Sequence, residues 1–145
     1  MENRMKLEFL SKSANEGFAR AAIAAFVSQL DPTLEELADI KTAVSEAVTN
    51  AVVHGYGHGA GIVTISCELT SDKTAVITIR DAGRGIEDVP AALEPLYTKS
   101  DSPERSGMGF TVMETFMDTM EVRSVPAKGT TVILTKQIVG APSAD

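Results

Sequence analysis

The sequence predicts an α+β fold, a two-layer sandwich with helices on one face of an antiparallel or mixed sheet. Residues 62–69 and 74–80 alternate apolar and polar side chains, the pattern of strands with one buried face, and the polar residues 70–73 join them as an antiparallel hairpin. Two longer segments before this hairpin carry helical periodicity and helix-start signals. Strands combined with segregated helices are typical of the α+β class.

The composition indicates one domain over residues 1–140 and a frayed tail at 141–145. A chain of 145 residues, 43% of them hydrophobic, is large enough for a single core. It contains no run of about 18 apolar residues, so we expect no membrane partner. The net charge of −7 argues against direct DNA binding, which needs clustered Lys and Arg. A protein is therefore the better expectation for a macromolecular partner.

The lone Cys67 has no companion for an internal disulfide or a metal cluster. It lies in the alternating segment 62–69, where a small buried side chain is more common than a reactive thiol. The N-terminus lacks the apolar core of a signal peptide. A reducing cytoplasm is therefore the expected location.

The N-terminal segment predicts a strand followed by a helix. Residues 5–10 alternate in polarity, as in a half-buried strand. Ser13 and Glu16 have the spacing of a capping box, which would open a helix that continues to residue 30. The segment 31–33 contains a proline and ends that helix.

A second capping box, Thr33 and Glu36, opens a helix that we expect to run to about His54. Gly55 would end it, because glycine adopts the left-handed conformation at little cost. One side of this helix is apolar and should pack on the sheet; it contains Leu37, Ile40, Val44, Ala47, Val48 and Ala51.

The second half of the chain continues with a turn, a long loop, a helix and a hairpin. The turn 81–86 follows the central hairpin directly, and a loop of about twenty residues extends over 87–106. A loop of that length inside a compact domain is usually functional. Residues 107–118 predict a third helix, and 120–125 with 130–139 predict a closing hairpin.

Glu46 and Asn50 place a carboxylate and an amide one helical turn apart, away from the apolar side of the second helix. Small side chains border them, which leaves room for a ligand to approach. The alternative is a pair of solvated side chains on an exposed face. The pair alone does not decide between the two.

The turn 81–86 has Asp-x-Gly-x-Gly spacing. Asp81 supplies a fixed hydrogen-bond acceptor at a strand end, and Gly83 and Gly85 let the backbone turn sharply and approach a ligand. A plain turn would use the same residues. Thr130 could direct its hydroxyl toward Asp81 if their strands are neighbours.

Gly107 and Gly109 open the third helix, where free backbone N–H groups and the helix dipole favour an anion. Lys99 and Arg105 in the preceding loop could add positive charge opposite phosphates. Each signal is weak by itself, because solvated side chains would leave the same pattern. Their order along the chain is more specific than any one of them.

These motifs resemble the GHKL ATPase family, which includes gyrase, Hsp90, histidine kinases and MutL. The N box of that family matches Glu46 and Asn50, its glycine boxes match the segments 81–85 and 107–109, and its Gly-Thr element matches 129–130. The resemblance covers nearly the whole chain. It implies a Bergerat-type ATP-binding fold with ATP or ADP and Mg²⁺ as ligands.

The resemblance also implies roles for single residues. Asn50 would coordinate Mg²⁺ on the ATP phosphates, Glu46 would be the general base, and Asp81 would accept from the adenine amino group. The long loop would form a lid over the phosphates, with Arg105 as a second catalytic residue. Arg84 stands where many relatives are uncharged, and would reach a phosphate or only solvent. Further nucleotide contacts are implied for His54, Gly83, Gly85, Thr98, Lys99, Ser106, Gly107, Gly109 and Thr130.

Within this family, the segments 45–56 and 104–118 look like the anti-sigma-factor serine kinases, most like the anti-sigma-F group of spore-forming bacteria. That likeness implies a sigma factor held inactive, an anti-anti-sigma antagonist phosphorylated on serine, and a homodimer. Arg20 on the first helix is a candidate contact to a partner, or else a solvated arginine.

Three alternatives stay open. The first is a binding module that uses ATP only to set its conformation; the presence of Glu46 counts against it, because such a module needs no general base. The second is the ATP domain of a histidine kinase, which the strand and the Ser13–Glu16 capping box at the N-terminus disfavour, because they make a self-contained start. The third is an anti-sigma-B-type stress-response kinase, which shares the same chemistry.

Overall fold

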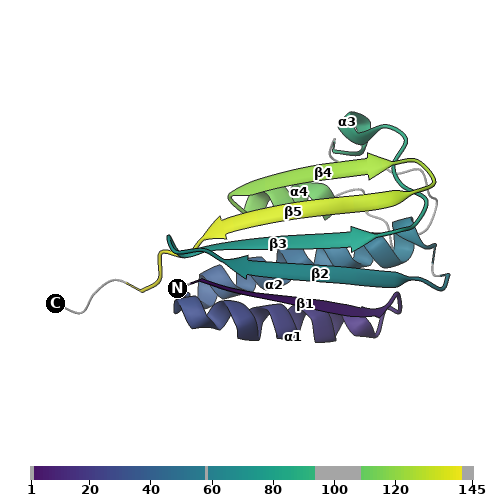
Figure 1. Ribbon diagram of the computed structural model, residues 1–145. Helices are drawn as coiled ribbons and strands as arrows, with labels where there is room; N and C mark the ends of the chain where they lie inside the picture. Colours follow the sequence, from purple (N-terminus) through teal and green to yellow (C-terminus); the bar gives the residue numbers. More distant parts are fainter. Residues whose placement is uncertain (1, 58, 94–108, 142–145) are drawn as a thin grey trace.

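The computed structural model describes residues 2–57, 59–93 and 109–141 and shows a two-layer α+β sandwich (Figure 1). One layer is a five-stranded sheet and the other consists of helices. Within those residues, no helix has the length and apolar character needed to cross a membrane. The predicted fold class is confirmed.

The sheet contains β1 (Asn3–Leu10), β2 (Ile62–Leu69), β3 (Thr74–Asp81), β4 (Thr119–Val125) and β5 (Gly129–Gln137). The strand order is β1-β2-β3-β5-β4, and every neighbouring pair is antiparallel. The predicted central hairpin is β2–β3, in which Ile65 pairs with Ile79. The last strand of the chain, β5, thus lies inside the sheet, between β3 and the edge strand β4.

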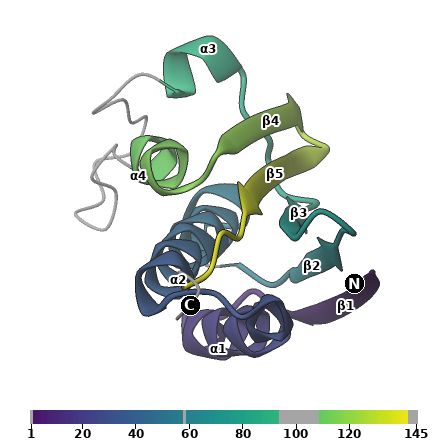
Figure 2. The ribbon, with the colours of Figure 1, turned by 90° about the vertical axis from the view of Figure 1, so that its left-hand side faces the viewer.

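The helical layer contains α1 (Asn15–Val27), the 3₁₀ turn η1 (Ser28–Leu30), α2 (Leu34–Thr49), the π-helical turn η2 (Asn50–Gly55) and α4 (Gly109–Phe116). Figure 2 shows α1, α2 and α4 side by side on one face of the sheet, with α2 in the middle. The two layers enclose one apolar core. Its fully buried members include Ile23, Ile40, Val44, Ile65, Ile77 and Leu134.

The capping box predicted for the first helix is wrong. Helix α1 has Ala14 as its N-cap, and no side chain caps it. The Ser13 carbonyl instead accepts from the Glu16 N–H at 3.2 Å, and the Lys12 carbonyl accepts from the Asn15 N–H at 2.9 Å. Residues 12–16 therefore form a backbone turn that leads from β1 into the helix, and this turn satisfies the N–H groups that a cap would have bound.

The capping box predicted for the second helix is confirmed. Thr33 Oγ1 accepts from the Glu36 N–H at 3.0 Å, and Glu36 Oε1 accepts from the Thr33 N–H at 2.9 Å. The predicted apolar side of α2 is buried except for Leu37, which is half-buried. The sequence pattern therefore places the start of α2 and its orientation correctly.

The end of the second helix differs from the prediction. Helix α2 ends at Thr49 and continues as η2, where the Tyr56 N–H bonds the Ala51 carbonyl five residues back at 3.1 Å. Gly55 does not take the left-handed conformation, which first occurs after this helix at Gly57, with a φ of 56°. Glycine is required at 55 for another reason. A Cβ there would lie 2.7 Å from Oδ1 of Asp81.

Part of the predicted long loop is helical. Residues 89–92 form α3 (Val89–Ala92), and the Asp88 carboxylate caps it by accepting from the Ala91 N–H at 3.1 Å. Residues 94–108 and 142–145 lie outside the described part of the chain, and with them the start predicted for the third helix and nearly all of the predicted tail.

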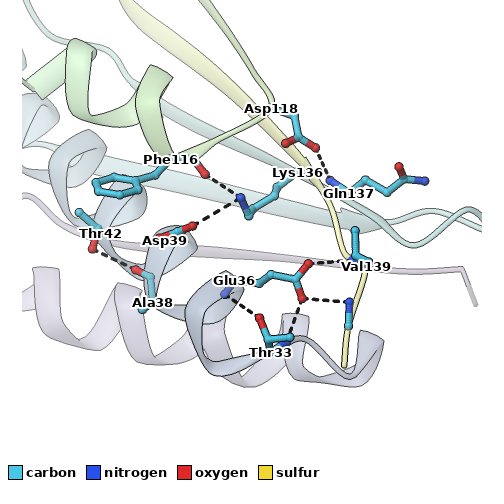
Figure 3. A network of polar contacts seen from close by, with 11 residues as sticks. Thr33, Glu36, Ala38, Asp39, Thr42, Phe116, Asp118, Lys136, Gln137 and Val139 are labelled. Atoms are coloured by element: carbon cyan, nitrogen blue, oxygen red, sulfur yellow. Dashed lines mark hydrogen bonds and ion pairs between the residues drawn. The ribbon is translucent and has the colours of Figure 1, made fainter. Parts of the chain in front are cut away.

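Polar contacts tie α2 to the end of the chain (Figure 3). Lys136 Nζ lies 3.7 Å from Asp39 Oδ2 and donates to the Phe116 carbonyl at 2.9 Å, which connects β5 with α2 and with the end of α4. The Glu36 carboxylate accepts from the backbone N–H groups of residues 139 and 140. The same carboxylate thus caps α2 and holds the segment that follows β5.

Candidate functional site

Many of the residues predicted to bind a nucleotide converge on one cavity of about 470 Å³. The cavity lies between α2 and η2 on one side and the ends of β3, β5 and α4 on the other. Its volume suits a small-molecule ligand. The predicted site residues that line it are Glu46, Asn50, His54, Asp81, Gly85, Gly109 and Thr130.

Glu46 and Asn50 form the helical wall of the cavity, on successive turns where α2 passes into η2. Both meet the start of α4, because a Cβ on Gly109 would lie 3.2 Å from Asn50 Oδ1 and 3.3 Å from Glu46 Oε2. Burial raises the pKa of Glu46, and the negative charge of Glu16 raises it further. A carboxylate with a raised pKa is a better proton acceptor than one in water, which suits a general base.

Asp81 contributes a buried carboxylate from the end of β3 and is 8% exposed. Its Oδ1 accepts from the Gly83 N–H at 2.9 Å. Burial raises the pKa of Asp81, and the backbone N–H groups of Gly83 and Thr130 partly offset that rise. The carboxylate is therefore fixed and largely desolvated, and it can accept from an N–H donor of a ligand in the cavity.

The two glycines of the turn 81–86 make room for the protein's own backbone. A Cβ on Gly83 would lie 2.0 Å from the Gly55 carbonyl oxygen, and Gly83 does not line the cavity. Gly85 does line it; its φ is 74°, and a Cβ there would lie 2.3 Å from the Val125 carbonyl oxygen. Both positions therefore need glycine for packing, and a close approach to a ligand stays a prediction.

Thr130 lies opposite Asp81 in the register of β3 and β5, so the two strands are neighbours as the prediction required. Its backbone N–H is the group that reaches the Asp81 carboxylate. Its hydroxyl lies 2.8 Å from Ser124 Oγ, which also donates to the Gly129 carbonyl at 2.9 Å. The side chain of Thr130 is thus held by β4.

Arg20 is described but does not line the cavity. Its guanidinium donates to Glu16 Oε1 at 3.1 Å and to Ser45 Oγ at 3.2 Å, and its side chain is 42% exposed. It therefore joins α1 to α2 beside Glu46 and is not merely solvated. Five other predicted site residues lie outside the described part of the chain: Thr98, Lys99, Arg105, Ser106 and Gly107.

Tyr56 is a residue of this region that the sequence pattern did not indicate. Its hydroxyl donates to the Ile62 carbonyl at 2.7 Å and accepts from the Ala82 N–H at 2.7 Å. Ala82 follows Asp81 directly, so the phenol holds the backbone that carries this carboxylate. No local signal could reveal the role, because Ala82 lies 26 positions away in the sequence.

Arg84 lines the cavity, but neither expectation for it describes its contacts. Its guanidinium donates to the carbonyls of Val53 and His54 at the end of η2, in addition to facing solvent. A prediction limited to phosphate or water overlooked the backbone carbonyls at the end of η2 as acceptors.

The donor set of the cavity fits Mg²⁺ only as an ion shared with a ligand. In residues 2–57, 59–93 and 109–141, no group of three or more His, Cys, Asp or Glu side chains is placed to hold a metal. Glu46 and Asn50 bring two oxygen donors together at Gly109. Mg²⁺ prefers such oxygens, retains water and commonly binds substrate phosphates. The residues therefore fit an ion that phosphates help to hold.

The sequence matches the family model described as Histidine kinase-like ATPase domain over residues 9–136. It is 60% identical over 137 residues to the Anti-sigma F factor of Clostridium novyi (strain NT), across 94% of this chain and 95% of that protein. It is 58% identical over 136 residues to the Anti-sigma F factor of Thermoanaerobacter sp. (strain X514), across 94% of each.

Two solved structures are similar in fold. The RsbU and RsbW domains of a Mycobacterium tuberculosis protein match with a TM-score of 0.68 at 20% identity, over 94% of this chain and only 32% of that one. The mycobacterial sensor histidine kinase MprB matches with a TM-score of 0.58 at 12% identity, over 96% of this chain and 100% of that one. Sequence and fold agree, and the chain belongs to the histidine kinase-like ATPase domain family, among the anti-sigma F factors.

Proposed function

We propose that the protein is an anti-sigma factor and a protein serine kinase. It holds a sigma-F-type factor inactive and uses Mg·ATP to phosphorylate a serine of an anti-anti-sigma antagonist. The observation that carries this proposal is the meeting of Glu46 and Asn50 with the start of α4 in a cavity that also contains Asp81. The name of the relatives, Anti-sigma F factor, supports the sigma-factor partner and favours it over a sigma-B type.

ATP would bind with its adenine amino group donating to Asp81, the desolvated carboxylate of the cavity. Its phosphates would extend toward Asn50, which with the phosphate oxygens would hold Mg²⁺. When bound, the ion would supply positive charge that offsets the negative charge of the phosphates during transfer. His54 and Thr130 line the same cavity and would complete the contacts from the described residues.

In the transfer step, the Glu46 carboxylate accepts the proton from the serine hydroxyl of the antagonist. The serine oxygen forms a bond to the γ-phosphorus, the bond from that phosphorus to the β,γ-bridging oxygen breaks, and ADP leaves. The raised pKa of Glu46, caused by burial and then by Glu16, supports its role as the base. Arg105 and the backbone of Gly107 would stabilise charge on the transferred group.

The proposed partners dock near Arg20. Its guanidinium is bound by Glu16 and Ser45 yet 42% of the side chain is exposed, so a partner's acceptor can reach it. Ser45 precedes Glu46, so a protein docked there lies beside the proposed base. We also propose a homodimer and, because a sigma factor acts on RNA polymerase, a cytoplasmic location.

The test is phosphotransfer from γ-labelled ATP with Mg²⁺ to the antagonist-like protein encoded nearest this gene. The parental protein should place an acid-stable label on a serine. Glu46→Gln should lower the rate by about 10²- to 10⁴-fold, the usual contribution of a general base, with ATP binding retained. Glu35→Gln, an exposed glutamate on the same helix, is the matched control and should transfer at the parental rate.

Two results would contradict the proposal. Transfer by Glu46→Gln at the parental rate would remove the general-base role. No label on the antagonist, combined with ATP-dependent capture of a sigma factor, would identify the protein as a binding module that ATP only gates.

A further inference from the structure

The end of η2 presents three consecutive backbone carbonyls, and one residue far away in the sequence binds all of them. The Arg84 backbone N–H donates to the Gly55 carbonyl at 2.9 Å. Its side-chain Nη2 donates to the Val53 carbonyl at 3.4 Å, and its Nε donates to the His54 carbonyl. Carbonyls at a helix C-terminus generally lie beyond the reach of donors within the helix, and here Arg84 donates to three of them.

Charge favours the same arrangement. Aligned peptide dipoles place partial negative charge at a helix C-terminus, and a cation there is stabilising. A guanidinium is permanently charged and presents its N–H donors in a fixed planar fork, so it can bind two adjacent carbonyls at once. Arg84 therefore acts as a side-chain cap of η2, supplied by the turn 81–86.

Arg84 is also fixed from the other side. Its own carbonyl accepts from the Ala127 N–H at 2.6 Å, in the turn between β4 and β5. On either side of it, Gly83 packs on the Gly55 backbone and Gly85 on the Val125 backbone. One residue thus joins η2, the turn 81–86 and the β4–β5 turn, and all three segments contribute residues to the cavity wall.

We infer that Arg84 is a positioning residue for nucleotide binding. Arg84 caps η2, which carries Asn50 and His54 in the cavity wall. It thereby fixes the distance between η2 and the turn 81–86, which contains Asp81. Its side chain acts through these carbonyls and not as a ligand of the phosphates. The inference rests on the proposed function only in that ATP and ADP are the ligands used to detect it.

The experiment compares Arg84→Met, which removes both guanidinium bonds, with Arg84→Lys, which keeps the charge and one donor group. Arg80→Met is the matched control, because Arg80 is exposed on β3 and does not line the cavity. Calorimetry gives the Kd of each variant for Mg·ATP and Mg·ADP. Amide hydrogen exchange in the nucleotide-free protein follows the Tyr56 N–H, which bonds inside η2.

In Arg84→Met the Kd for ATP and for ADP should rise by the same factor, about 3- to 10-fold, as expected for the loss of partly exposed hydrogen bonds. The Tyr56 amide should exchange faster by a similar factor, because the end of η2 opens more often. Arg84→Lys should recover part of both effects. Arg80→Met should match the parental protein.

If the Kd of Arg84→Met rose by a factor at least tenfold greater for ATP than for ADP, the inference would be overturned, because that result would identify Arg84 as a ligand of the γ-phosphate. Unchanged affinity and exchange in Arg84→Met would overturn it as well. If the parental protein bound neither nucleotide, the proposed function would fail, and the exchange of the Tyr56 amide would still decide whether Arg84 holds the end of η2.

Discussion

Replacing Glu36 with alanine should destabilise the protein far more than replacing its neighbour Glu35. The Glu36 carboxylate accepts from the N–H groups of Thr33 at 2.9 Å, Val139 at 2.8 Å and Gly140 at 3.0 Å. Alanine removes all three bonds. A hydrogen bond to a charged group contributes about 1.5–3 kcal/mol, and we take about 1 kcal/mol for each because this carboxylate is only partly buried. The expected loss in unfolding free energy is therefore about 2–4 kcal/mol.

Urea unfolding at pH 7 measures this difference. Glu35 is the matched control, because it lies in the same first turn of α2 but is exposed. Glu35→Ala loses only the interaction with the helix dipole, about 0.3–1 kcal/mol. Glu36→Gln keeps one acceptor oxygen and should fall between the two alanine variants. If Glu36→Ala cost no more than Glu35→Ala, the contact with the end of the chain would contribute nothing.

The same carboxylate predicts a dependence on pH. Burial alone would raise the pKa of Glu36. The hydrogen bonds from the backbone N–H groups of Thr33, Val139 and Gly140 together outweigh this effect, so the pKa lies below its usual value. A carboxyl whose pKa is lower in the folded state contributes stability above the unfolded pKa and loses it as the pH falls through the folded pKa. The difference in unfolding free energy between the parental protein and Glu36→Ala should thus have its full value at pH 7 and become smaller below about pH 4. An equal difference at pH 7 and pH 3 would show that the charge is not needed.

Three further substitutions test the cavity and the core. Gly55→Ala places a Cβ 2.7 Å from Asp81 Oδ1, and the resulting displacement should weaken ATP binding by about tenfold or more in calorimetry. Gly17→Ala on α1 is its control, because the added Cβ would make only an ordinary contact, 3.7 Å from Arg20 Nη2, and equal affinities of the two variants would refute the argument. Tyr56→Phe removes both hydroxyl hydrogen bonds and should cost about 1–2 kcal/mol in urea unfolding, so an unchanged midpoint would contradict it. Ile77→Ala, at a position with 0% exposure, should cost about 2–5 kcal/mol in the same assay, and a loss below about 1 kcal/mol would mean that the core refills the space.

Local signals predicted the parts of the fold that depend on neighbouring residues. The β2–β3 hairpin follows from alternation around a short turn, and the start of α2 follows from the Thr33–Glu36 box. The box at Ser13 failed because the Glu16 N–H, which the Ser13 hydroxyl would have bound, bonds the Ser13 carbonyl instead. The insertion of β5 beside β3 depends on pairing between residues 49 to 63 positions apart, which no local pattern encodes.

The residues of the candidate site likewise divide into those that the sequence predicted and those that it did not. Side-chain chemistry at fixed spacing singled out Glu46, Asn50 and Asp81, and the resemblance to the GHKL family gave them roles; the fold brings all three to one cavity. The roles of Arg84 and Tyr56 were not predicted, because Arg84 bonds the carbonyl of a residue 30 positions away and Tyr56 accepts from an N–H 26 positions away, and any residue can supply such a backbone group.

The place of β5 in the sheet has a consequence for the order in which the protein is assembled during synthesis. A chain leaves the ribosome from its N-terminus. The first three strands and the first two helices therefore emerge early, and one edge of β3 stays unpaired until β5 emerges. Thr130, which lies beside Asp81, is part of that strand. The cavity is therefore complete only after β5 has left the ribosome. A ligand of this cavity can stabilise the folded protein, but it cannot assist the nascent chain before that point.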